Sequence, residues 1–195
     1  MVFVVLEGFS GTGKTTLARG LEGMGWLRLA ESAHAVPDIV PVAERADTAA
    51  DYSLLGATLV NCSVVSRLRR DRKIVSEGYL LSDLAYAKIR QELGKSAAYP
   101  SMMAAVKSVL GEEGLRPDLY LLLVAKDDTI VARQQNKNDR ERNPTGFFRE
   151  RYYSALAEIH GELGEGRVER VLTDTDPSVT LGEVIAAMKR RGLAV

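Results

Sequence analysis

The sequence predicts an α/β fold in which a parallel sheet of five strands lies between two layers of helices. Short apolar segments alternate with longer amphipathic segments along the 195 residues. Such alternation is typical of sheets built from right-handed strand–helix–strand crossovers. Residues 2–6 form a continuous apolar run, as expected of a strand buried on both faces, and a glycine-rich turn follows directly.

Four further strands are expected from short runs that are rich in apolar and β-branched residues. They lie at residues 26–30, 73–76, 119–124 and 168–172. After the first strand, the run at residues 119–124 is the clearest of these. Because each is separated from the next by a helical segment, the strands are expected to be parallel.

Helices are expected where apolar residues recur every three or four positions. The first spans residues 14–22 and ends at Gly23 and Gly25. The others are expected at residues 48–70, 83–93, 101–110, 127–135, 144–163 and 179–191. Residues 32–47 show little periodicity and are interpreted as a loop. Since no repeat or linker divides the chain, a single domain over residues 1–195 is the simplest organisation.

The composition is that of an ordinary globular protein, with 46% hydrophobic and 27% charged residues. The formal net charge is zero, which argues against a general nucleic-acid binder. No apolar run approaches the ~20 residues that span a bilayer, and the N-terminus lacks a signal-peptide pattern. The lone Cys62 is expected to be a buried thiol in a cytoplasmic protein. A homodimer is compatible with these features.

The segment GFSGTGKT at residues 8–15 matches the P-loop pattern at every fixed position. Its glycines allow several backbone N–H groups to point at one phosphate, next to the N-terminus of the following helix. Lys14 is expected to contact the β- and γ-phosphates of ATP, and the Thr15 hydroxyl to bind Mg²⁺. The segment therefore predicts a three-layer α/β/α sandwich of the P-loop NTPase class. Its expected nucleotide contacts are Gly8, Ser10, Gly11, Thr12, Gly13, Lys14, Thr15 and Thr16.

Two acidic residues are candidates for the chemistry of phosphoryl transfer. Glu77 follows the third strand and is the predicted second Mg²⁺ ligand, or the group that orients the acceptor, because ligands bind at that edge of such sheets. Glu31 follows the second strand and is the predicted general base. The plain alternatives are a solvated loop acid for Glu77 and a charge at a helix N-terminus for Glu31. Glu7 either contributes to the site or is a structural hydrogen-bond partner, and Tyr79 is a candidate to stack on a base.

A basic segment is interpreted as a lid that closes over the phosphates, at about residues 133–146. Planar guanidinium groups match phosphate oxygens, and a polar turn can move over a bound nucleotide. Arg140 and Arg142 are the predicted catalytic arginines, and Arg133 is a predicted nucleotide contact. The alternative is a solvated, charged turn.

Several motifs on either side of the P-loop extend a family likeness over nearly the full chain. They are Leu6-Glu7-Gly8, Glu77-Gly78-Tyr79 with Ser82 and Ala85-Tyr86, Arg116-Pro117-Asp118, and Asp139-Arg140-Glu141-Arg142. With them the chain resembles the thymidylate kinase and deoxynucleoside kinase group of P-loop kinases. The resemblance implies that Glu31 lies near the acceptor and that Thr173 and Asp174 lie under the adenine. One departure is Gly78, where the group carries an arginine that contacts substrate or phosphate.

The sequence therefore predicts an ATP- and Mg²⁺-dependent phosphotransferase that acts on a small acceptor, a nucleoside or nucleoside monophosphate. Two alternatives stay open: a kinase of another small metabolite, because of Gly78, and a nucleotide-hydrolysing regulatory ATPase. A GTPase is not favoured, since Asn136-Lys137-Asn138-Asp139 spells a guanine-reading motif but does not follow a strand. His34 and His160 have no partners at metal-binding spacing.

Overall fold

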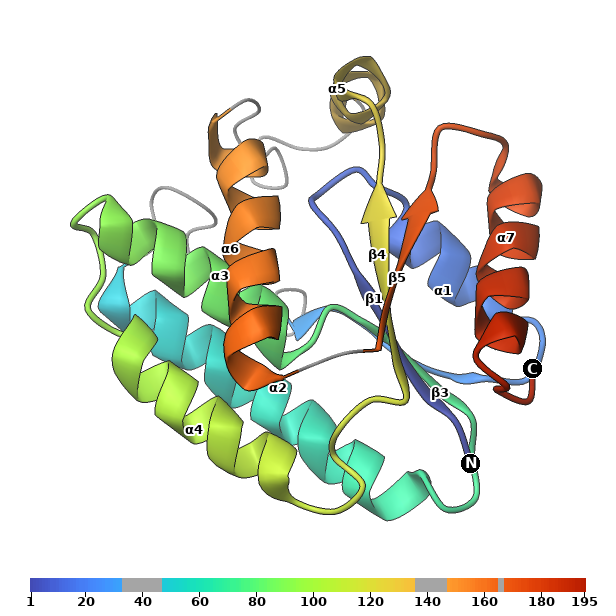
Figure 1. Ribbon diagram of the computed structural model, residues 1–195, viewed down its shortest axis with the longest axis horizontal. Coiled ribbons are helices and arrows are strands. Elements are labelled where there is room, and N and C mark those ends of the chain that lie inside the picture. The colour runs from blue at the N-terminus through green and yellow to red at the C-terminus, as the bar shows by residue number, and fades with distance from the viewer. Residues whose placement is uncertain (33–46, 136–146, 165–166) are drawn as a thin grey trace.

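The sheet in the computed structural model has five parallel strands among the residues that the structure describes, which are 1–32, 47–135, 147–164 and 167–195. Their order across the sheet is β2-β3-β1-β4-β5 (Figure 1). The bounds are β1 (Phe3–Glu7), β2 (Leu27–Leu29), β3 (Ile74–Glu77), β4 (Leu119–Val124) and β5 (Val168–Leu172). The predicted parallel sheet of five strands is confirmed.

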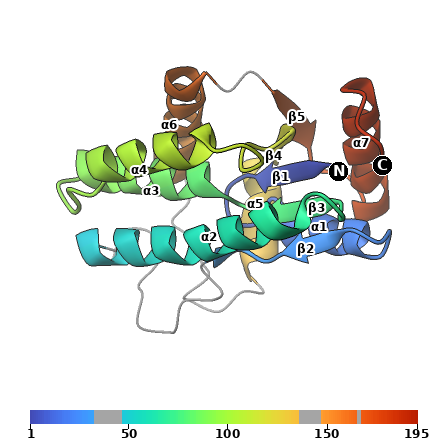
Figure 2. The ribbon, with the colours of Figure 1, turned by 90° about the horizontal axis from the view of Figure 1, so that it is seen from below.

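Helices cover both faces of this sheet (Figures 1 and 2). In the described part of the chain they are α1 (Lys14–Glu22), α2 (Thr48–Leu68), α3 (Leu80–Glu92), α4 (Tyr99–Gly111), α5 (Asp127–Gln135), α6 (Phe147–Leu163) and α7 (Pro177–Arg190). One face is covered by α1 and α7, and the other by α2, α3, α4 and α6. Helix α5 lies beyond the carboxyl end of β4 (Figure 1). The predicted three-layer α/β/α arrangement is confirmed.

Strand β1 is buried on both faces because it lies at the centre of the sheet. Phe3 and Val5 join the apolar cluster under α2, α3, α4 and α6. Val4 and Leu6 join the cluster under α1 and α7, and all four side chains are fully inaccessible. The strand therefore holds the residues that follow it, the predicted P-loop, at the carboxyl edge of the sheet.

Helix α3 begins at Leu80, three residues before the predicted start. Gly78 has a φ of +68°, so the chain turns sharply after β3 and enters the helix at once. This turn directs Tyr79 back into the core, where its ring lies edge-on to Phe3 at a centroid distance of 5.2 Å. Because Tyr79 is only 2% exposed, the hypothesis that it stacks on a base is wrong.

The remaining sequence-based expectations concern Cys62, membrane spans and two loops. The Cys62 thiol is buried, and burial raises its pKa. None of the helices in the described ranges combines the length and apolarity needed to cross a bilayer. Most of the predicted loop at residues 32–47 and of the predicted lid at residues 133–146 lies outside the described residues.

His160 on α6 provides a test of this packing. Its imidazole lies edge-on to Tyr120, with ring centroids 5.0 Å apart, and burial lowers its pKa to about 4. A histidine in the unfolded chain titrates near pH 6.5. Between these values the unfolded state binds more protons, so the free energy of unfolding decreases as the pH falls from about 6.5 to 4.

We expect the wild type to lose about 2 kcal/mol more than His160→Leu when the pH falls from 7.5 to 5. Urea denaturation at both pH values measures this difference, and the variant serves as its own reference at pH 7.5. An identical pH dependence of the two proteins would contradict the buried, neutral state of His160.

Candidate active site

The P-loop begins where β1 ends, and its glycines are required by its backbone. Gly8, Gly11 and Gly13 have φ angles of +155°, +92° and +93°, which side chains rarely adopt. A Cβ atom on Gly8 would lie 2.7 Å from both the Leu123 carbonyl oxygen and the Thr12 hydroxyl. The loop can therefore take this course only with glycine at position 8.

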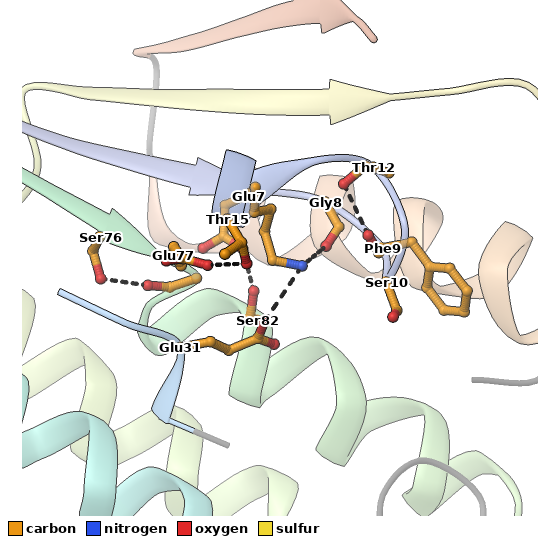
Figure 3. Close-up of polar contacts among 12 residues, drawn as sticks. Glu7, Gly8, Phe9, Ser10, Thr12, Thr15, Glu31, Ser76, Glu77 and Ser82 are labelled. Carbon is orange, nitrogen blue, oxygen red and sulfur yellow. Dashed lines mark hydrogen bonds and ion pairs between the residues drawn. The ribbon is translucent and has the colours of Figure 1, made fainter. Parts of the chain in front are cut away.

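Side chains within and behind the loop hold it in place. The Thr12 hydroxyl donates to the Phe9 carbonyl at 2.8 Å (Figure 3). Phe9 is fully buried, and its ring lies edge-on to Tyr152 of α6 at a centroid distance of 5.9 Å. The Phe9 N–H donates to the Tyr153 hydroxyl at 3.5 Å. Helix α6 therefore anchors the loop to the core.

Lys14, the first residue of α1, forms an ion pair with Glu31, which follows β2. Its ammonium group donates to the Gly8 carbonyl at 2.7 Å and lies 3.7 Å from Glu31 Oε2. The Lys14 side chain is 8% exposed, whereas that of Glu31 is 32% exposed. The P-loop cation and an accessible carboxylate, both predicted site residues, are thus brought together.

Thr15 and Glu77, the two predicted Mg²⁺ ligands, are in direct contact. The Thr15 hydroxyl donates to Glu77 Oε2 (Figure 3). Glu77 is the last residue of β3 and is buried, and its Oε1 accepts a hydrogen bond from Arg28 Nε at 2.5 Å. A hydroxyl and a carboxylate are oxygen donors of the kind that Mg²⁺ prefers. The residues present therefore fit this metal.

In the described residues, no three His, Cys, Asp or Glu side chains form a cluster that could hold a metal ion. Arg28 was not predicted from the sequence. Its place in the sequence could have indicated a role, because Arg28 is a single charged residue between Leu27 and Leu29 of β2, the strand next to β3.

Of the two alternatives for Glu7, the structure favours a structural hydrogen-bond partner over a group exposed to ligands. It is fully buried, and its Oε2 accepts hydrogen bonds from the Ser82 hydroxyl and, at 3.5 Å, from Tyr152. Burial raises the pKa of Glu7 to about 8, so the carboxyl is neutral at pH 7. It connects β1 to α3 and α6 next to the P-loop.

Asp83 is a second acid near the site that the sequence interpretation did not select. Its Oδ2 accepts a hydrogen bond from the Thr58 hydroxyl of α2 at 2.6 Å, and the Thr58 hydroxyl oxygen lies 2.8 Å from that of Ser32. Desolvation raises the pKa of Asp83 to about 7. The sequence could have indicated Asp83, because it directly follows Ser82 within the family-like motif that begins at Glu77.

The predicted nucleotide side of the site joins α5, the P-loop and the turn after β5. Arg133 Nη2 donates to the Thr173 carbonyl at 2.6 Å, and Nη1 donates to the Gly11 carbonyl at 3.3 Å. The neighbouring Gln134 donates to the Ser10 carbonyl at 2.9 Å. Two predicted nucleotide contacts from distant parts of the chain, Arg133 and Thr173, therefore lie beside the loop.

The other predicted residues are more dispersed. Asp174 accepts a hydrogen bond from the Lys126 N–H at 2.8 Å, which holds the pKa of this carboxyl below its usual range. Thr16 lies on the exposed side of α1. Arg140 and Arg142 lie outside the described residues.

A parallel sheet with a phosphate loop after its central strand, followed directly by a helix, is the P-loop α/β fold. No family model matches the chain. Among solved structures, it is similar to deoxyadenosine kinase from M. mycoides with bound dATP, at 16% identity and a TM-score of 0.63, over 96% of this chain and 100% of that one. The same enzyme with bound dCTP gives 13% identity and a TM-score of 0.65, over 97% and 100%.

Thymidylate kinase from Candida albicans is similar at 18% identity and a TM-score of 0.66, over 97% of this chain and 93% of that one. At such identities the likeness shows the fold. The chain thus has the fold of nucleoside and nucleotide kinases over nearly its whole length, as the resemblance in sequence implied.

The close approach at Gly8 can be tested by Gly8→Ala. We expect the added methyl group to lower the free energy of unfolding by about 1–3 kcal/mol, because it overpacks the turn. We also expect it to weaken Mg·ATP binding at least tenfold, since the loop amides must move. Denaturation and titration calorimetry measure the two effects.

The matched control is Gly56→Ala on α2, where an added Cβ would meet no atom within 4 Å. Alanine should be neutral or stabilise this exposed helix position by up to about 1 kcal/mol, without any change in ATP binding. Normal ATP affinity in Gly8→Ala would refute the assignment of the loop as the phosphate site.

Proposed function

We propose that this chain is an ATP-dependent kinase that phosphorylates a small acceptor, a nucleoside or a nucleoside monophosphate. One observation carries the proposal: the P-loop Lys14 lies 3.7 Å from the accessible Glu31 carboxylate. Lys14, the cation for the transferring phosphate, and Glu31, the base for the acceptor, are thus adjacent. The nucleotides bound to the structurally similar deoxyadenosine kinase, dATP and dCTP, support the class of acceptor.

In the proposed reaction, the acceptor oxygen attacks the γ-phosphorus of ATP as the bond to the bridging oxygen breaks, and ADP leaves. Glu31 takes the proton of an acceptor hydroxyl. Lys14 moves from the Gly8 carbonyl to the phosphates and offsets their negative charge. The amides of residues 8–13, at the N-terminus of α1, bind the phosphate groups.

Thr15 and Glu77 are the proposed ligands of Mg²⁺. Arg28 holds Glu77 Oε1, which leaves Oε2 beside the Thr15 hydroxyl. When bound, Mg²⁺ would neutralise charge on the phosphate oxygens. These two side chains then orient the triphosphate relative to Glu31.

The remaining assignments concern the nucleotide and the lid. Arg133, Thr173 and Asp174 are proposed to contact the base and phosphates of ATP, because Arg133 joins the Gly11 carbonyl of the P-loop to the Thr173 carbonyl, and Asp174 is the next residue. Arg140 and Arg142 stay predicted lid arginines.

A kinase of another small metabolite is the second candidate, and Gly78 is the observation that favours it. Its φ of +68° strains any side chain at this position. A Cβ atom there would lie 3.4 Å from the Ser82 hydroxyl and 4.0 Å from Glu31 Cγ. This position lies next to the proposed base but supplies no cation for an acceptor phosphate.

Product analysis with γ-labelled ATP tests the proposal. We expect label to appear on an added nucleoside or nucleoside monophosphate, and Lys14→Ala to reduce transfer at least ~100-fold with an unchanged melting temperature. The matched control is Lys107→Ala, an exposed lysine paired with Glu162 at 3.1 Å, which should retain full activity. Release of free phosphate without a labelled acceptor would support the regulatory ATPase instead.

Glu31→Gln tests the proposed base. The amide keeps the shape of the side chain but cannot take the proton, so kcat should fall at least ~100-fold while the KM for the acceptor changes little. Steady-state kinetics on the purified variant measure both constants, with Glu162→Gln, far from the site, as the control. A variant with the kcat of the wild type would remove Glu31 from the mechanism.

A further inference from the structure

Arg28 of β2 has no contact with substrate in the proposed reaction, yet its guanidinium group lies directly on a proposed metal ligand. Arg28 Nε donates to Glu77 Oε1 at 2.5 Å. The Arg28 side chain is 20% exposed and that of Glu77 is fully buried. Salt screens a contact of this kind far less than an exposed ion pair. The pair therefore constrains what the Glu77 carboxylate can do at the metal site.

The register of the sheet places Arg28 on the face that carries the metal ligands. Arg28 is opposite Val75 of β3, which lies two residues before Glu77. Side chains two residues apart on a strand lie on the same face, and Val75 belongs to the apolar cluster under α1 and α7. Leu27 and Leu29, on either side of Arg28, contact the cluster on the opposite face. The strand thus directs Arg28 toward α1, where Glu77 meets the helix.

The two oxygens of the Glu77 carboxylate have different partners. Oε1 accepts a hydrogen bond from the cationic Arg28, whereas Oε2 accepts one from the neutral Thr15 hydroxyl (Figure 3). Hydrogen bonds from charged donors are about twice as strong as those between neutral groups. A metal ion at Thr15 therefore finds only Oε2 of Glu77 available, since Oε1 is covered by a guanidinium of like charge to the ion.

A carboxylate that offers a single oxygen suits Mg²⁺ better than Ca²⁺. Mg²⁺ demands a nearly octahedral shell, keeps several of its waters and takes few protein oxygens. Ca²⁺ is larger, takes about six to eight oxygen ligands and can bind both oxygens of one carboxylate. The contact of Arg28 with Oε1 denies Ca²⁺ that second oxygen.

A second acid, Glu22, lies on the other side of the guanidinium. Its Oε2 is 3.9 Å from Arg28 Nη1, and its side chain is 52% exposed. Exposed ion pairs of this kind contribute little. The buried contact with Glu77 is therefore the one that holds Arg28 in place, and Glu22 provides a control for it.

We propose that Arg28 is a positioning residue that restricts Glu77 to one available oxygen and thereby makes the metal site selective for Mg²⁺ over Ca²⁺. The inference rests on the proposed function, in which Thr15 and Glu77 bind the metal of Mg·ATP. It deepens that function, because it assigns the choice of metal to a residue that acts through Glu77 and touches neither the nucleotide nor the acceptor.

Calorimetry with a non-hydrolysable ATP analogue in Mg²⁺, in Ca²⁺ and in EDTA tests the inference without turnover. In the wild type, we expect Mg²⁺ to strengthen binding at least about tenfold more than Ca²⁺ does. In Arg28→Met, which keeps an unbranched side chain but no donor, this preference should fall at least about tenfold. Loss of one positive charge changes the attraction of both divalent ions alike, so the ratio of affinities reports the geometry of Glu77.

Three further variants show whether the effect passes through Glu77. Glu22→Gln removes only the exposed partner of Arg28, and Arg191→Met removes a matched contact, from Arg191 Nε to Glu169 Oε1 at 2.8 Å, between the end of α7 and β5. Both should keep the wild-type preference. In a Glu77→Gln background, Arg28→Met should change the preference no further. A general structural effect of Arg28→Met would weaken binding in EDTA as well, which we expect to be unchanged.

The outcomes separate the inference from the proposed function. An Arg28→Met protein that folds and keeps the wild-type preference overturns the role of Arg28, as does a wild type that does not distinguish the two ions. If the variant does not fold, a crystal structure of the wild type with Mg²⁺ and the analogue decides. Arg28 on Oε1 with the ion on the side of Oε2 supports the inference, and an ion on Oε1 or away from Glu77 overturns it. An analogue that binds in none of the three conditions overturns the proposed function itself.

Discussion

The close approach of the Gly8 backbone to the carbonyl oxygen of Leu123 is the constraint on which the rest of the site depends. There is room for the backbone at this point but not for a side chain, since a Cβ would lie 2.7 Å from that oxygen. Because β1 is hydrogen-bonded to β3 on one side and β4 on the other, the turn that follows it has a fixed origin. The positions of Lys14 and Thr15, and their contacts with Glu31 and Glu77, follow from that origin.

Three glutamates at one edge of the sheet acquire different properties from their surroundings. Glu7 is fully buried and neutral, Glu77 is buried but paired with Arg28, and Glu31 is accessible beside Lys14. The same chemical group thus serves as a structural hydrogen-bond partner, a proposed metal ligand and a proposed base. Such division of roles by environment is common where acids cluster in enzymes.

Much of the fold could be predicted because its signals are local. The ranges of α1, β4, α5 and β5 agree with the sequence prediction, since Gly23 marks the end of α1 and short apolar runs mark the two strands. The start of α3 was missed because it depends on the positive φ of Gly78, which also sends Tyr79 into the core. Pairs such as Arg28–Glu77 and Asp51–Arg90 join residues 49 and 39 positions apart, and no local pattern encodes such contacts.

Phe9 has a consequence for how the protein loses its order on heating. This residue occupies a variable position of the P-loop, yet its side chain is a fully buried member of the main apolar cluster. Regions that open before global unfolding are those with few buried apolar contacts, and this loop is not one of them. The nucleotide-binding turn and the core should therefore melt as one cooperative unit, so that a warmed sample keeps its capacity to bind until the whole fold gives way.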